Sequence, residues 1–136
     1  MTPSPAVLAV ALYAVLNGLI PFGLAAHVGR TRVRLWISIG DSGNPAMIRA
    51  RRGQANFVKY VPLILLQMAL MALIGTPVWV IHLFGVALTL GSLLHGWRFA
   101  EGDAPGWQRA AGTALTLVPL VVGSLGLAAH ALAGML

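Results

Sequence analysis

The sequence predicts an all-α integral membrane protein in which four helices cross the bilayer in up-down topology and form one bundle. Three observations support this fold class. First, 58% of the 136 residues are hydrophobic and only 9% are charged, whereas a soluble domain carries about 25% charged residues. Second, the apolar residues form four stretches, each long enough for a bilayer crossing of about 20 residues. Third, all lysine and arginine residues lie in or next to the first and third connections between these stretches, which are on the same side of the predicted membrane.

The first two spans are predicted at residues 5–28 and 46–74. The first ends where Gly29 introduces a run of arginines, and the second begins after the turn-forming residues 40–45. Pro62 lies inside the second span. Because arginines and turn-forming residues separate the two spans, the connection between them is predicted to be short and polar.

The third and fourth spans are predicted at residues 78–99 and 107–133, separated by a loop at 101–106. Trp79 and Trp97 lie near the two edges of the third span, where tryptophan anchors membrane helices at the interface. No stretch is left over for a soluble domain, so the whole chain is predicted to be one membrane domain.

The basic residues predict the orientation of the bundle. Seven lie in the first connection or at the adjoining start of the second span, and two flank the third connection: Arg30, Arg32, Arg34, Arg49, Arg51, Arg52 and Lys59, then Arg98 and Arg109. The second connection and both termini carry none. Because cytoplasmic loops are rich in lysine and arginine, the first and third connections are predicted in the cytoplasm and both termini outside.

The composition also excludes several classes of protein. The chain has no cysteine, so a disulfide framework and a cysteine metal site are excluded. Motifs for zinc hydrolysis, a serine triad or a phosphate-binding loop are absent, so we expect no metal site and no nucleotide chemistry. The net charge of +6 accompanies a mean hydropathy of +0.84. This combination indicates contact with membrane lipids rather than with nucleic acid.

One face of the second span carries the residues best suited to bind a ligand. Arg49, Arg52, Asn56 and Lys59 follow one another at steps of three, four and three residues, which places them on one side of a helix. Arginine binds carboxylates, and a helix start favours anions, so this face predicts a site for a small polyanion. Lys59 lies about 10 Å deeper than Arg52, so it should face the bundle interior and have a partner.

Membrane topology offers a competing explanation for the other arginines. Four of them are expected only to set the orientation and to reach lipid headgroups: Arg30, Arg32, Arg34 and Arg51. Asn56 has no topological role, and a buried amide needs partners. We therefore favour a functional interpretation for Arg52 and Asn56.

Polar and small residues also follow stripes on the last two spans. The stripe on the third span contains His82, Gly85, Thr89, Ser92 and Gly96, and the one on the fourth contains Arg109, Thr113 and Thr116. Small residues on such stripes let helices approach closely. His82 is expected to be structural, and His95, nearer the cytoplasmic edge, remains a candidate for chemistry.

The start of the second span resembles the signature of a known family. Residues 52–62 read RGQANFVKYVP, which is similar to the RxxxNxxE-plus-proline signature of MAPEG proteins, the membrane-associated proteins in eicosanoid and glutathione metabolism. The turn at 40–45 and five later residues resemble the bacterial branch of the family: Trp79, His82, Gly85, Gly91 and His95. The resemblance implies a homotrimer in a bacterial inner membrane, with glutathione bound between neighbouring subunits.

The resemblance also implies roles for individual residues. Arg52 and Asn56 would contact glutathione, with Arg49 and Lys59 on the same face. Arg109 matches the fourth-helix arginine that stabilises the glutathione thiolate. That role is chemically sound, because a nearby guanidinium lowers the pKa of a thiol and the thiolate is the nucleophile.

The sequence departs from the family pattern at several working positions. Lys59 replaces the signature glutamate, and a lysine cannot accept the hydrogen bonds that a carboxylate accepts. Ala72 stands at a second acidic position, Ser92 at an arginine position, and Phe99 where a tyrosine is expected.

Two functions therefore compete. The first is a glutathione transferase or peroxidase that acts on lipophilic electrophiles arriving from the bilayer. The second is a non-catalytic scaffold of the same family that binds anionic lipid or another amphipathic acid through the same basic face. Retained Arg52, Asn56 and Arg109 favour the first function, and Lys59 favours the second.

The charge distribution makes the orientation testable. Because both termini are predicted outside, a reporter that is active only in the cytoplasm should be silent when fused to the C-terminus. The same reporter inserted in the first connection should be active. A bright C-terminal fusion would reverse the predicted orientation.

Overall fold

The chain forms four long helices in an up-down bundle, as the sequence predicts. The computed structural model describes residues 2–101 and 106–136, and of residues 98–101 only the backbone. The predicted roles of Arg98, Phe99, Glu101 and Asp103 therefore lie outside the described residues. The helices are α1 (Pro5–Leu35), α2 (Pro45–Leu73), α3 (Val78–Glu101) and α4 (Trp107–Met135).

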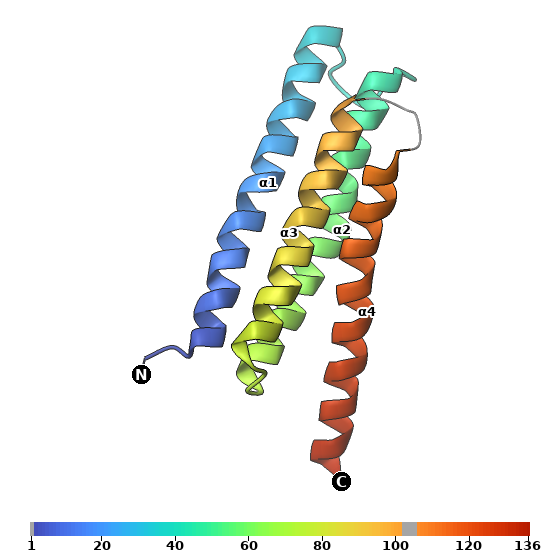
Figure 1. Cartoon of the computed structure of the whole chain (residues 1–136). Helices are drawn as coiled ribbons and strands as arrows, with labels where there is room; N and C mark the ends of the chain where they lie inside the picture. Colours follow the sequence, from blue (N-terminus) through green and yellow to red (C-terminus); the bar gives the residue numbers. More distant parts are fainter. Residues whose placement is uncertain (1, 102–105) are drawn as a thin grey trace.

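Successive helices run in opposite directions, so the chain ends lie together at one end of the bundle (Figure 1). The α1–α2 connection lies at the opposite end, together with the end of α3 and the start of α4. Each of the four helices is long and apolar enough to cross a membrane. The arrangement confirms the predicted all-α, four-helix fold class.

Helix starts follow local capping chemistry. The side chain of Ser4 accepts a hydrogen bond from the amide of Val7, and Pro5 occupies the first turn of α1, where a missing N–H costs nothing. The side chain of Asn44 caps α2 in the same way, and Pro45 follows it. Both starts are therefore encoded by a cap residue followed by proline.

The end of α1 differs from the prediction. We expected this span to end at Val28, but the helix continues through Gly29 to Leu35. A single glycine inside a helix costs only about 1 kcal/mol, and the following arginines, valine and leucine tolerate a helix. Trp36 ends α1 instead, in the left-handed conformation with φ of 56°.

The packing of the bundle is typical of a protein surrounded by lipid. Its core contains fully buried apolar side chains such as Ile64, Met68 and Leu88. Large apolar side chains also cover the outside, where Phe22 is 76% exposed and Leu19 is 65% exposed. Apolar groups on both sides of a helix indicate a membrane environment.

Glycines set the closest approaches between helices. A methyl group on Gly112 of α4 would lie 3.0 Å from the carbonyl oxygen of Gly91 on α3. A methyl group on Gly85 of α3 would overlap the ring of Tyr13 on α1. This confirms the packing role that the sequence predicts for Gly85.

The crossing of α3 and α4 yields a stability prediction. Gly112→Val should lower the unfolding midpoint in detergent, because overpacking at a close crossing costs roughly 1–3 kcal/mol. Gly126→Val is the matched control on the same helix, since nothing in the chain lies within 4 Å of its added methyl group. Equal unfolding midpoints for the two variants would contradict the proposed close contact.

Candidate functional site

Polar side chains from three helices line one pocket near the end of the bundle that carries the α1–α2 connection. The pocket has a volume of about 130 Å³. Its lining comprises Leu24 of α1; Gly53, Asn56, Phe57, Tyr60 and Val61 of α2; Ser92 and His95 of α3; and Arg109, Thr113, Thr116 and Leu117 of α4. None of these described residues is acidic, so the pocket suits an anionic ligand.

Residues of α2 reach the pocket through helical periodicity. Gly53, Asn56 and Tyr60 follow one another at steps of three and four residues, so they lie on one stripe that faces α3 and α4. Asn56 is half-buried there. The amide both donates and accepts hydrogen bonds, which suits a ligand with polar groups of both kinds.

A chain of hydrogen bonds joins α3 and α4 at the pocket. The hydroxyl of Thr113 donates to the carbonyl oxygen of Arg109 at 2.8 Å, and this hydroxyl oxygen, Oγ1 of Thr113, also lies 3.1 Å from Nε2 of His95. Because the hydroxyl has one hydrogen and donates it to the carbonyl, Nε2 of His95 must be the donor to Thr113. The contact therefore fixes the tautomer of a neutral His95, with Nδ1 as its acceptor.

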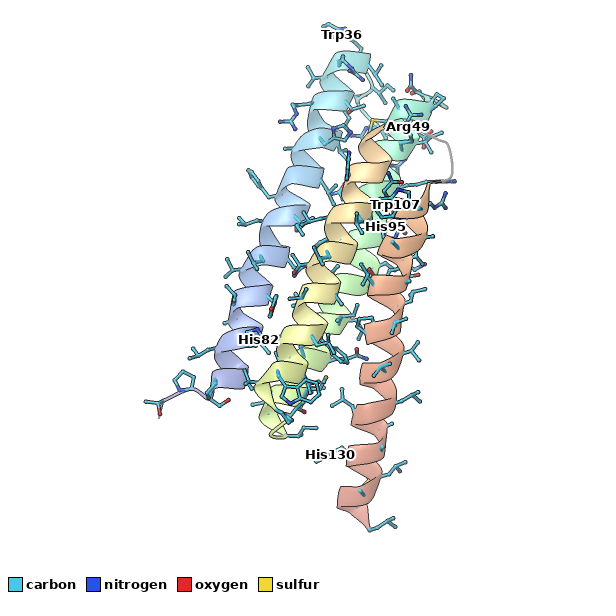
Figure 2. The ribbon with its side chains drawn as sticks, in the orientation of Figure 1. Trp36, Arg49, His82, His95, Trp107 and His130 are labelled. Carbon is cyan, nitrogen blue, oxygen red and sulfur yellow. The ribbon has the colours of Figure 1, made fainter. Side chains whose placement is uncertain are left out.

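Of the residues predicted to bind or activate glutathione, two line this pocket, and so does His95, the candidate for chemistry on the third span. Asn56 and Arg109 are far apart in sequence, and the fold brings them to the same cavity. Arg52 instead lines a groove on the other side of α2, beside Arg51. Arg49 lies on α2 two turns before Asn56 and is half-buried. In Figure 2 it lies closer to the α1–α2 connection than His95 does.

Lys59 does not face the interior of the bundle within this chain. The residue is exposed, and its ammonium group lies 5.4 Å from the centre of the Tyr60 ring. The prediction of an interior position was wrong because Lys59 is rotated about 60° from Asn56 in one direction around α2, whereas the pocket residues Gly53 and Tyr60 are rotated from Asn56 in the other direction. Asn56 thus points inward, whereas Lys59 lies outside the pocket.

Several pocket residues were not predicted as site residues. The sequence stripes that contain Ser92, Thr113 and Thr116 were assigned to helix packing, yet these residues also line the cavity. In the sequence, Tyr60 is notable only as part of the family signature at residues 52–62. Its position four residues after Asn56 is the signal that could have found it, because residues at this spacing share a helix face.

A second polar network lies between α1 and α3, away from the pocket. The amide of Asn17 donates to the hydroxyl of Thr89 at 2.8 Å, and the hydroxyl of Tyr13 lies 3.1 Å from Nδ1 of His82. The rings of Tyr13 and His82 also meet edge to face. These contacts join two helices, as expected for a structural His82.

Four apolar helices, each long enough to cross a membrane, define an integral membrane protein, and a small pocket lined by Arg109 and by no acidic residue among those described lies near one end of the bundle. The sequence matches the MAPEG family over residues 10–129. Because this match covers most of the chain, the protein belongs to the MAPEG family. The resemblance expected from residues 52–62 is therefore confirmed.

Curated relatives agree with this assignment. The chain is 34% identical over 89 residues to inner membrane protein YecN of Escherichia coli strain K12. The aligned segment covers 65% of this chain and 68% of the relative. YecN of Escherichia coli O6:H1 strain CFT073 matches with the same identity and coverage. The chain is thus similar to proteins of a bacterial inner membrane.

The bridging hydroxyl at the pocket can be tested directly. Thr113→Val should destabilise the protein by about 1 kcal/mol, because it removes the hydroxyl that accepts the half-buried N–H of His95. Thr113→Ser keeps the hydroxyl and should preserve most of the stability. Thermal unfolding in detergent measures both variants, and a larger loss in Thr113→Ser than in Thr113→Val would show that the methyl group rather than the hydroxyl matters.

Proposed function

We propose that the protein binds glutathione at the pocket and acts as a glutathione transferase or peroxidase on lipophilic electrophiles. The observation that carries this proposal is the joint presence of Asn56 and Arg109 in one cavity. The family resemblance implies glutathione contacts at both positions. A pocket whose described lining has a guanidinium and no carboxylate fits an anionic thiol ligand.

The size of the pocket limits what one chain can hold. Its volume of about 130 Å³ is below the roughly 300–1,000 Å³ typical of small-molecule sites. Only part of the tripeptide would fit, and we place the thiol of its central cysteine there, beside Arg109. The remainder would lie between this chain and a neighbouring copy, consistent with the homotrimer that the family resemblance implies.

When bound, glutathione supplies a thiolate that forms a carbon–sulfur bond with an electrophile while the leaving group departs. Arg109 would hold the negative charge on sulfur, because a nearby cation favours the thiolate over the thiol. Asn56 would orient the peptide through its amide. The surrounding bilayer would deliver the apolar substrate, since the outer surface of the bundle is apolar.

The exposed position of Lys59 gives it a different role from that of the glutamate it replaces. The ammonium group can pair with a ligand carboxylate but cannot accept a hydrogen bond from the ligand's own ammonium group. In our proposal, Lys59 and Arg49 bind the carboxylates of the part of glutathione that extends outside the pocket, whereas Arg52, which lines the groove on the other side of α2, does not take part. By similarity to YecN, we place the protein in a bacterial inner membrane with its basic loops in the cytoplasm.

Calorimetry with glutathione on detergent-purified protein tests the proposal. Asn56→Ala and Arg109→Leu should each weaken binding by about ten- to a hundredfold, the loss of a hydrogen bond to a charged group of roughly 1.5–3 kcal/mol. Arg109→Leu should also lower the thiolate absorbance of the bound ligand.

Gln54→Ala and Gln108→Ala are matched controls, because they remove a polar side chain next to the site without touching the pocket lining. Both controls should bind as the wild type does. Absence of glutathione binding by the wild type at millimolar concentration would reject the transferase and leave the scaffold that binds another amphipathic acid.

A further inference from the structure

A second concave surface lies on the side of α2 that faces away from the pocket. It is an open groove of about 700 Å³ between the end of α1, the α1–α2 connection and the start of α2. Its lining has five polar and four apolar residues: Arg32, Asp41, Arg51, Arg52 and Gln54, and Val28, Ile48, Ala55 and Val58. Ile48 lies beside the arginines, and Val28, Ala55 and Val58 lie farther from the α1–α2 connection. It shares no lining residue with the pocket of Asn56 and Arg109.

Two guanidinium groups in this α1–α2 groove are fixed by the protein. Nη1 of Arg32 donates to three carbonyl oxygens of the α1–α2 connection at 3.1–3.4 Å: those of Ile37, Ser38 and Gly40. Nη1 of Arg51 lies 3.0 Å from Oδ2 of Asp41. A snorkelling arginine that only sets topology needs no such fixed contacts. The contacts of Arg32 preorganise its guanidinium group for a ligand, whereas Asp41 holds Arg51 beside the groove and competes with an anionic ligand for it.

The groove carries excess positive charge. Three arginines and one aspartate line it, and Asp41 neutralises only one of the three cations. Within the described part of the chain, Arg52 has no ion-pair partner. Arginine binds phosphate through parallel N–H donors, so a phosphate monoanion fits this end of the groove.

The apolar end of the groove lies deeper along both helices. Val58 follows Arg51 by seven residues, or about 10 Å along α2, and Val28 lies one turn before Arg32 on α1. Helix α1 has 31 residues, about 46 Å, whereas the hydrocarbon core is about 30 Å thick. With its apolar part in the core, the last turns of α1 and their arginines lie at the level of the headgroups.

We propose that the α1–α2 groove binds an acidic glycerophospholipid from the adjoining leaflet. Arg32, Arg51 and Arg52 hold its phosphate, and Val28 and Val58 contact the glycerol and the first part of an acyl chain. The combination of fixed guanidinium groups with an apolar wall distinguishes this ligand from free phosphate. This site is separate from the glutathione pocket and does not depend on it.

Native mass spectrometry of the detergent-purified protein with phosphatidylglycerol or phosphatidylcholine tests the proposal. The wild type should bind phosphatidylglycerol at least tenfold more tightly than phosphatidylcholine. Arg51→Gln should abolish most of this preference, and Arg34→Gln should keep it. Arg34 is the matched control, because it is an exposed arginine of α1 outside the groove. Equal loss in both variants would show a response to net charge alone and overturn the proposal.

The Asp41→Asn variant should change the affinity for phosphatidylglycerol in the opposite direction from Arg51→Gln. It removes the negative charge from the groove and keeps the oxygen that accepts the amide of Gly43, so the turn should survive. Affinity for phosphatidylglycerol should rise severalfold. An unchanged or lower affinity would contradict the placement of the phosphate beside Arg51.

Two further measurements separate this site from alternatives. Inorganic phosphate at the same concentration should not displace phosphatidylglycerol, and equal competition would mean a phosphate site rather than a lipid site. Calorimetry with glutathione on Arg51→Gln should match the wild type, whatever affinity the wild type has. A parallel loss of glutathione binding would show that the groove and the pocket are one site.

Discussion

The dry interior of the bilayer is the constraint on which this structure depends. Without water, each polar side chain at membrane depth needs a partner from the protein. The side-chain amide of Asn17 on α1 donates a hydrogen bond to Thr89 on α3, and that of Gln67 on α2 donates one to Ser124 on α4. Such pairs fix which helix faces meet, a choice that the apolar surfaces leave open because lipid and leucine are equally apolar.

Close crossings then decide where a cavity can form. Gly91 and Gly112 bring the backbones of α3 and α4 together. His95, one turn after Gly91, and Thr113, directly after Gly112, line the pocket. The pocket therefore lies beside a close backbone contact between these helices. Its polar groups are held by packed backbone rather than by loops, which suits a site that must bind a ligand in one orientation.

Helix α2 separates two surfaces of different chemistry. Its inner stripe, with Asn56 and Tyr60, faces the enclosed pocket, and its outer stripe, with Arg51 and Val58, faces the open groove. Arginines that seemed equivalent in the sequence thus have different surroundings. Arg51 pairs with Asp41, whereas Arg30 and Arg34 are exposed. Orientation of the bundle and ligand binding can both use the same short basic segment.

The sequence by itself determined the fold class, the up-down order of the helices and the family, because hydropathy, proline and glycine punctuation and the residues 52–62 are local signals. It also identified Asn56 and Arg109, which line the pocket together. It did not place Lys59 outside the pocket or extend α1 to Leu35. Only the tertiary structure decided these points and recruited His95 with Thr113, because the rotation of each helix about its axis depends on contacts with the other helices.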